Sequence, residues 1–188
     1  MDPIIQEMHF VQRCTIFLYR FGRVKKMEIR QAKMADLPTI MSIYESARVF
    51  MKKHGNPTQW KEGYPGREVI EADIMAGNCY VCEQKERIAG VFSLIIGEDP
   101  TYRNIEHGTW HSTQTYGTIH RLASDGKTGG IAKACFAFCA EKCSYLRIDT
   151  HADNLPMQGA ILKFGFQKCG IIRVADGSER IAFDIQLR

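Results

Sequence analysis

The most informative segment of the sequence reads Ala123-Ser124-Asp125-Gly126-Lys127-Thr128-Gly129-Gly130-Ile131-Ala132-Lys133. It lies between a segment typical of a strand, 116–124, and a segment typical of a helix, 130–143. Small residues at such a turn let backbone N–H groups approach a ligand closely, and the helix start adds the positive end of its dipole. We therefore expect an anion site suited to phosphates, with added charge from Lys127 and Lys133. A plain tight turn before a helix is the alternative.

Two common phosphate-binding motifs do not fit this segment. Gly126-Lys127-Thr128 imitates the end of a Walker A loop, but that motif needs another glycine five residues before Gly126, where Arg121 stands. The dinucleotide motif G-x-G-x-x-G is missing as well. A nucleotide-binding module is therefore disfavoured.

The flanking sequence predicts an alternation of strands and helices. Expected strands cover about 27–32, 79–84, 87–96, 116–124, 145–150, 166–173 and 179–187, and expected helices cover about 36–53, 67–77, 130–143 and 155–164. Because some strands form hairpins and others are separated by helices, we predict an α/β (α+β) domain at residues 27–188 with a mixed sheet and helices on both faces.

Composition and charge narrow the function. Of 188 residues, 45% are hydrophobic and 24% are charged, as in an ordinary globular domain. No apolar run reaches the ~18–20 residues that a membrane span needs. The net charge is +4, but residues 1–26 hold five basic and two acidic side chains, so residues 27–188 are nearly neutral. We therefore expect neither nucleic acid nor membrane as a partner.

We interpret residues 1–26 as an N-terminal extension before a domain that begins at Met27. An extra helix or strand docked on the domain is the alternative.

The seven cysteines do not form a metal or disulfide pattern. Cys135, Cys139 and Cys143 recur every four residues, as expected for small apolar residues along one helix face. Cys79 and Cys82 form a C-x-x-C inside a strand, which points them to opposite faces of the sheet. We expect buried structural cysteines, no metal, and a reducing cytoplasmic location.

Two motifs resemble the GNAT acyltransferase superfamily. Lys127-Thr128-Gly129-Gly130-Ile131-Ala132 is similar to its pyrophosphate signature Q/R-x-x-G-x-G/A. Asp153-Asn154, Pro156-Met157 and Lys163-Phe164-Gly165-Phe166 resemble its second region, N-x-x-A-x-x-L-Y-x-K-x-G-F. The resemblance covers residues 27–188 and implies a mostly antiparallel sheet of about six or seven strands.

The resemblance also implies that the domain binds acetyl-CoA as an acyl donor. The strand ending Leu122-Ala123-Ser124 would pair with the pantetheine arm in a cleft where it splays from the next strand. The turn would hold the pyrophosphate, and a residue after the fifth strand would bond the pantetheine. The implied cofactor-binding residues are Leu122, Ala123, Ser124, Lys127, Thr128, Gly129, Gly130, Ile131, Ala132, Lys133 and Asn154.

Two positions depart from the family pattern. Lys127 replaces the preferred glutamine or arginine and keeps a positive charge. Ile161 stands where the family often has a tyrosine that protonates the leaving thiolate. Either another acid serves, for which Tyr145 and Cys169 are weak candidates, or solvent protonates the thiolate.

Acyl transfer to an amine is helped by a base, because most amines are protonated at neutral pH. His120, on the strand expected to bind the cofactor, is our first candidate, since histidine titrates near neutrality. His151 is the second candidate, and the pair Glu98-Asp99 is the third. The alternatives are a histidine packed in the sheet for His120, a loop or helix-entry contact for His151, and a solvated turn for Glu98-Asp99. Arg121 alternates with His120 and is expected on the other face, as a surface charge or an ion-pair partner.

The two long loops carry four aromatic residues, which either form a wall for the acceptor or cap the core: Trp60, Tyr64, Tyr102 and Trp110.

We predict an N-acetyltransferase that acts on a primary amine of a small molecule or peptide by direct attack in a ternary complex. The alternative is a catalytically inactive acyl-CoA-binding sensor or interaction domain. A homodimer is compatible with the sequence.

Overall fold

The computed structural model describes residues 27–61 and 63–187, so the expected extension 1–26 lies outside the described residues. The strands are β1 (Glu28–Gln31), β2 (Cys79–Gln84), β3 (Arg87–Ile96), β4 (Gly117–Ser124), β5 (Tyr145–Thr150), β6 (Gln167–Arg173) and β7 (Glu179–Gln186). The α-helices are α2 (Leu37–Lys53), α3 (Arg67–Met75), α4 (Ile131–Lys142) and α5 (Leu155–Phe164), with short 3-10 turns η1 (Met34–Asp36) and η2 (Pro100–Tyr102). None of the described helices combines the length and the apolar character that crossing a bilayer requires.

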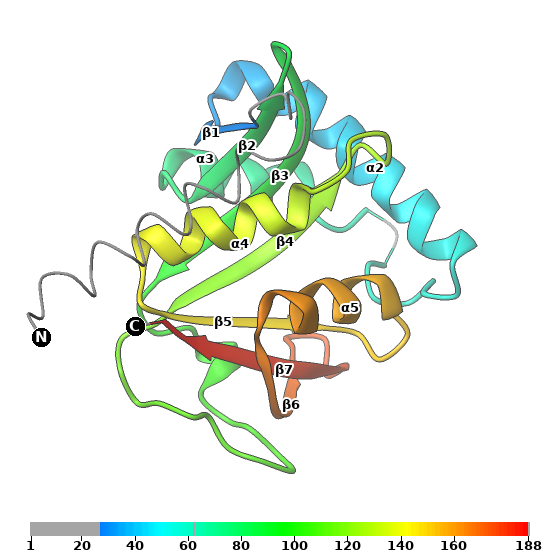
Figure 1. The fold of residues 1–188 in the computed structure, drawn as a ribbon. Coiled ribbons are helices and arrows are strands. Elements are labelled where there is room, and N and C mark those ends of the chain that lie inside the picture. Colours follow the sequence, from blue (N-terminus) through cyan, green and yellow to red (C-terminus); the bar gives the residue numbers. More distant parts are fainter. Residues whose placement is uncertain (1–26, 62, 188) are drawn as a thin grey trace, which may run out of the picture.

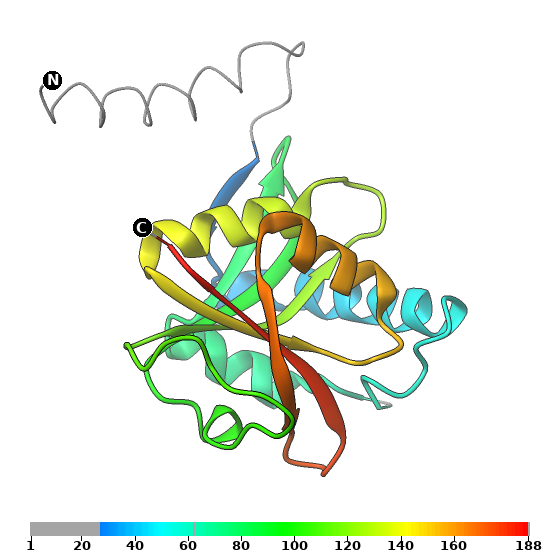
Figure 2. The same cartoon turned by 60° about the horizontal axis from the view of Figure 1, so that its bottom comes forward.

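The strands form one seven-stranded sheet in the order β1-β2-β3-β4-β5-β7-β6. Every neighbouring pair is antiparallel except β4 and β5, which are parallel. Helices α2 and α3 cover one face, and α4 and α5 cover the other (Figures 1 and 2). The predicted fold class, a mixed and mostly antiparallel sheet between two layers of helices, is confirmed.

Alternating side chains of the strands supply a separate apolar core to each face. Phe92 of β3 packs with the α4 side, whereas its neighbour Val91 packs with the α2 side. Cys79 and Cys82 likewise belong to opposite cores, as their spacing in a strand predicts. Cys135 and Cys139 are fully buried on the inner face of α4. These thiols therefore act as small apolar side chains, in agreement with the sequence analysis.

Strands β4 and β5 pair over only three positions, and their pairing ends at Ile119 and Ile148. Just beyond this point β4 bulges, because the register with β3 shifts between Val91 and Ser93. Arg121, at the bulge, has a φ of +53°, which is uncommon for a side chain larger than glycine. A bulge bends and twists a strand, so the end of β4 turns away from β5.

A glycine brings the start of α4 against the sheet. A Cβ placed on Gly90 of β3 would lie 2.4 Å from Cγ2 of Ile131 and 3.1 Å from the carbonyl oxygen of Ala123. Ile131 is the first residue of α4. A side chain at position 90 would therefore push away both the helix N-terminus and the end of β4.

We expect Gly90→Ala to destabilise the protein by about 1–3 kcal/mol, because overpacking a close contact forces neighbouring atoms to shift. Gly159→Ala in α5 is the matched control, since a Cβ there meets no atom within 4 Å. It should leave stability unchanged or raise it by up to ~1 kcal/mol through helix propensity. Urea unfolding of the two variants checks this. Equal effects of both substitutions would contradict the proposed contact.

Candidate active site

A cavity of about 790 Å³ lies where β4 and β5 separate. Its walls come from α2, the loop after it, both strands, the starts of α4 and α5, and the β6–β7 turn. The lining residues are Ser46, Ala47, Phe50, Met51, Gln59, Trp60, Lys61, Tyr64, Ile95, Asp99, Thr101, Ile119–Ser124, Gly126, Ala132, Ile148–Thr150, Asn154, Pro156, Met157, Ala160, Val174–Asp176 and Arg180.

The free edge of β4 offers backbone hydrogen bonds to this cavity. The amide of Asp125 donates to the Ala89 carbonyl of β3 at 2.9 Å. Because successive amides of a strand point to alternate edges, those of Leu122 and Ser124 point away from β3. Residues 122–124 all line the cavity. This edge can pair with an extended, peptide-like ligand.

The turn after β4 is held in shape by its own carboxylate. Oδ1 of Asp125 accepts hydrogen bonds from the amides of Lys127 and Thr128, both at 2.9 Å. Arg87 forms an ion pair with Asp125 and donates to Thr128 Oγ1 at 3.0 Å. Burial opposes ionisation of Asp125, but these hydrogen bonds and the Arg87 charge keep its pKa below the ordinary value. The amide of Thr128, one of those at 128–132 that the resemblance implied for the pyrophosphate, is thus already bonded within the protein, as is that of Lys127.

The backbone amides at the start of α4, unlike those of Lys127 and Thr128, are not bonded to Asp125. The first hydrogen bond of α4 runs from Ala134 N to the carbonyl of Gly130, so the amides of residues 131–133 have no partner within the helix. Gly130 has a φ of +84°, which glycine adopts without strain. A Cβ on Gly129 or Gly130 would meet no atom within 4 Å. The helix start is therefore an open position for an anion.

Asn154 joins the α5 side of the cavity to the loop after α2. Its Oδ1 accepts from Met157 N at 3.2 Å, which caps α5, and its Nδ2 donates to Gln59 Oε1 at 2.8 Å. Gln59 Oε1 also accepts from Asn56 Nδ2 at 2.8 Å. The sequence did not indicate Gln59, because this contact spans 95 residues.

His120 and Asp99 form a pair at the cavity wall, with 2.8 Å between Nε2 and Oδ2. Their side chains are 17% and 12% exposed. Burial opposes ionisation of Asp99, but the hydrogen bond and charge of His120 outweigh it and keep the pKa of Asp99 below its ordinary value. The Thr101 amide also donates to Asp99, at 2.9 Å. An ionised carboxylate can only accept a hydrogen bond, so Nε2 is the donor in this pair, and Nδ1 carries the lone pair in the neutral form of the ring.

The other candidate bases lie off the cavity wall. His151 Nδ1 accepts from the amide of Asp153 at 3.2 Å, a local contact at the entry to α5. Glu98 is exposed and forms an ion pair with Arg103 at 3.5 Å. Neither His151 nor Glu98 is among the lining residues. Arg121, expected on the opposite face from His120, forms an ion pair with Asp73 at 2.7 Å.

The groups considered as acids, and the position where the family often has one, also lie off the cavity wall. Ile161 is fully buried in the core under α5. Tyr145 and Cys169 do not line the cavity and both interact with Asp184. Burial, then the hydrogen bond to Asp184, raises the pKa of Tyr145 to about 12. The same two causes raise the pKa of the Cys169 thiol well above its ordinary value. Because neither group lines the cavity, neither is placed to protonate a sulfur that departs there.

The structure divides the four loop aromatics into two pairs. Trp60 and Tyr64 line the cavity, with their ring centroids 6.3 Å apart. Tyr102 is only 1% exposed, and Trp110 stacks on the Arg147 guanidinium at 4.0 Å. The first pair therefore borders the site, and the second pair fastens its loop to the sheet.

Four charged residues of the cavity, namely Lys61, Asp149, Asp176 and Arg180, were not indicated by the sequence. Asp149, near the end of β5, accepts from Tyr102 Oη at 2.5 Å. Arg180 of β7 lies 3.9 Å from Asp149 and donates to the Gln59 carbonyl at 3.0 Å. An acidic residue near the end of a mostly buried strand was the only signal for Asp149.

Comparisons with known proteins support one family. No protein-family model matches the sequence, and no curated protein matches it. Among solved structures, a GNAT-family acetyltransferase from Streptococcus agalactiae is 33% identical, with a TM-score of 0.78, over 86% of this chain and 95% of that chain. A Staphylococcus aureus protein described as an acetyltransferase is 28% identical, with a TM-score of 0.64, over 85% and 99% of the two chains. A Salmonella typhimurium protein described as an acetyltransferase, solved with its cofactor acetyl-CoA, is 15% identical, with a TM-score of 0.56, over 86% and 94% of the two chains, which shows the fold alone.

We expect Asp99→Asn to lower stability at neutral pH by about 1–2 kcal/mol, since a hydrogen bond to an ionised group is lost. The pKa of Asp99 is lowered in the folded state. Its contribution is therefore present above the ordinary carboxyl range and is lost as the pH falls through the folded pKa. Urea unfolding of both proteins at several pH values should show the difference shrinking in acid. A difference that stays constant with pH would contradict an ionised Asp99.

Proposed function

The chain belongs to the GNAT family of acetyltransferases, and on that premise we propose that it transfers an acetyl group from acetyl-CoA to a primary amine of a small molecule or peptide. The reaction is direct attack in a ternary complex. The observation that carries the proposal is the cavity between β4 and β5, which gathers free strand amides, an open helix start and the His120–Asp99 pair on one surface.

The described residues fit the shape and charge of acetyl-CoA. The Leu122 and Ser124 amides suit the peptide-like pantetheine arm, and the amides of residues 129–133, of which those of 131–133 have no partner within α4, suit the pyrophosphate. Lys127 and Lys133 are exposed beside that position and add positive charge. Asn154 borders the pantetheine side of the cavity. Bound acetyl-CoA supplies a thioester whose carbonyl carbon an amine can attack.

We assign His120 as the general base. Asp99 holds the ring by its Nε2–H, so Nδ1 takes the proton that the amine nitrogen loses as its bond to the acetyl carbon forms. The β4 amide at Leu122 or Ser124 donates to the carbonyl oxygen as negative charge builds there. With Ile161 in place of an acid, water entering the cavity protonates the departing sulfur.

Aromatic rings near the base suit an amine acceptor. The rings of Trp60 and Tyr64 line the cavity that also holds His120. Aromatic faces accept either the charge of an ammonium group or its apolar stem. These contacts support a primary amine without selecting one compound.

Gly129→Glu should abolish saturable binding of acetyl-CoA in calorimetry. The new side chain places a carboxylate where the pyrophosphate is proposed to bind, and position 129 offers free space and no positive φ, so the backbone is not strained. Gly129→Gln, of equal size without the charge, should weaken binding much less. Wild-type affinity in Gly129→Glu would refute the assigned pyrophosphate position.

Replacing His120 with glutamine should lower kcat about 10²–10⁴-fold, the usual contribution of a general base, with little change in KM for acetyl-CoA. Asp99→Asn should lower kcat less and alter the pH–rate profile, because Asp99 acts by positioning the imidazole. His151→Gln is the matched control and should keep wild-type turnover. A wild-type rate and pH profile in His120→Gln would remove it as the base.

The reaction itself is tested by incubating the protein with acetyl-CoA and a panel of amines, namely a diamine, amino acids and peptides with free N-termini. Mass spectrometry should detect one acetylated class together with free CoA. Tight binding of acetyl-CoA with no acetylated product across the panel would instead favour the inactive acyl-CoA-binding domain.

A further inference from the structure

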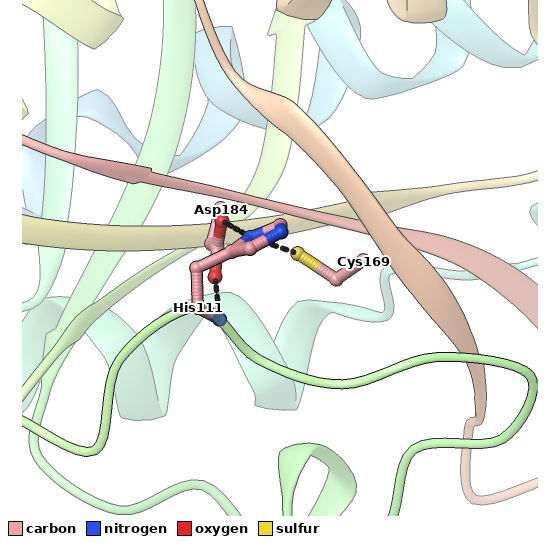
Figure 3. A group of neighbouring side chains, drawn as sticks. All are labelled: His111, Cys169 and Asp184. Atoms are coloured by element: carbon pink, nitrogen blue, oxygen red, sulfur yellow. Dashed lines mark hydrogen bonds and ion pairs between the residues drawn. The ribbon is translucent and has the colours of Figure 1, made fainter.

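Three potential metal ligands meet outside the proposed active site. His111 comes from the loop before β4, Cys169 from β6 and Asp184 from β7, and Figure 3 shows their side chains pointing toward one another. Their ligand atoms all lie within 4.8 Å of one another. None of the three lines the cavity between β4 and β5.

We propose that His111, Cys169 and Asp184 form a binding site for Zn²⁺. Imidazole nitrogen, thiolate and carboxylate are the donors that zinc prefers in proteins. The separation of Cys169 Sγ from His111 Nδ1 is 3.5 Å, close to the distance expected between two ligands of one tetrahedral zinc. His111 Nδ1 and Asp184 Oδ1 are 2.7 Å apart, a hydrogen bond that must open by about half an ångström for both to ligate the same ion.

The carboxylate is already oriented by partners outside the three ligands. Asp184 Oδ2 accepts from Tyr145 Oη at 2.6 Å and from the backbone amide of His111 at 2.9 Å. These bonds leave Oδ1 directed at the imidazole. Hydrogen bonds to the second oxygen of a ligating carboxylate are the usual support around protein metal sites.

The backbone brings His111 to the two strands through close packing. The amide of Glu106 donates to the Ile171 carbonyl at 2.8 Å, and that of Thr109 donates to the Cys169 carbonyl at 3.0 Å. A Cβ on Gly108 would lie only 1.7 Å from the Cys169 carbonyl oxygen, so this approach requires glycine. The loop is thus fixed against β6 just before the position from which His111 reaches inward.

Charge and access also suit a divalent cation. Asp184 is 2% exposed, whereas the His111 side chain is 46% exposed, so the site is buried on one side and open on the other. Zinc replaces the thiol proton of Cys169, and the resulting thiolate and the Asp184 carboxylate balance its two charges. A water completes four ligands on the open side. Arg147, the nearby cation, is held by the Trp110 ring and by the Ser112 carbonyl at 3.1 Å.

The proposed ion would fasten the 97–116 loop to the β6–β7 hairpin. That loop also carries Asp99, the partner of His120. We therefore expect zinc to stabilise the fold, and the binding test does not depend on acetyl transfer.

The test is titration of the chelator-treated full chain with ZnCl₂ in a calorimeter, alongside thermal unfolding with and without zinc. We expect one ion per chain and a higher Tm with zinc. His111→Gln and Cys169→Ser should each bind zinc at least about 100-fold more weakly, since even outer-shell changes cost 10–100-fold. With Co²⁺, a thiolate charge-transfer band should appear in the wild type and be lost in Cys169→Ser.

Cys143→Ser is the thiol control and should keep wild-type zinc affinity and the Co²⁺ band. Near-ultraviolet circular dichroism of each variant without metal establishes that it folds. If Cys169→Ser does not fold, His111→Gln still tests the site, because the His111 side chain is partly exposed. No binding by the wild type would overturn the proposal. Wild-type affinity in a folded His111→Gln or Cys169→Ser would overturn it as well.

Discussion

The early end of pairing between β4 and β5 is the constraint on which the rest of the site depends. Their ladder stops at Ile119 and Ile148, although both strands continue beyond it. If the pairing ran to the strand ends, the Leu122 and Ser124 amides would be used within the sheet and the cavity would close. The same divergence leaves the N-terminus of α4 open beside the end of β4, so that the free strand edge and the anion site lie in one continuous cleft.

A buried polar network holds the bulge that produces this divergence. Arg121 forms an ion pair with Asp73, Ser93 Oγ donates to the same carboxylate at 2.7 Å, and Tyr44 Oη donates to the Arg121 carbonyl at 3.0 Å. Buried ion pairs contribute little net stability because desolvation offsets their attraction, but they restrict the conformations available to the chain. Here the restriction fixes an unfavourable positive φ and thereby the direction of the β4 edge. The apolar cores thus supply most of the stability, whereas this polar network sets the geometry of the site.

The element order could be predicted because it depends on local signals. Apolar periodicity marks the strands and helices, and the glycines before Ile131 mark the turn, so both the fold class and the family were accessible from the sequence. The hydrogen-bond and ion-pair partners of the site residues could not be predicted from the sequence. Asp99 was only a third-ranked base, and its pairing with His120 depends on how a long loop folds back; the Asn154–Gln59 contact spans 95 residues. The occupation of the Lys127 amide by a carboxylate in its own turn also follows from three-dimensional geometry alone.

Amide hydrogen exchange resolved by NMR tests the central claim, that the free edge of β4 and the start of α4 together receive acetyl-CoA. Saturating acetyl-CoA should slow exchange of the Leu122 and Ser124 amides and of the amides at 129–133, because new acceptors bind them, while the amides of β6 and β7 change little. Unchanged exchange at Leu122 and Ser124 under saturation would contradict the account, since the ligand would then bind without using the edge that the divergence of β4 and β5 exposes.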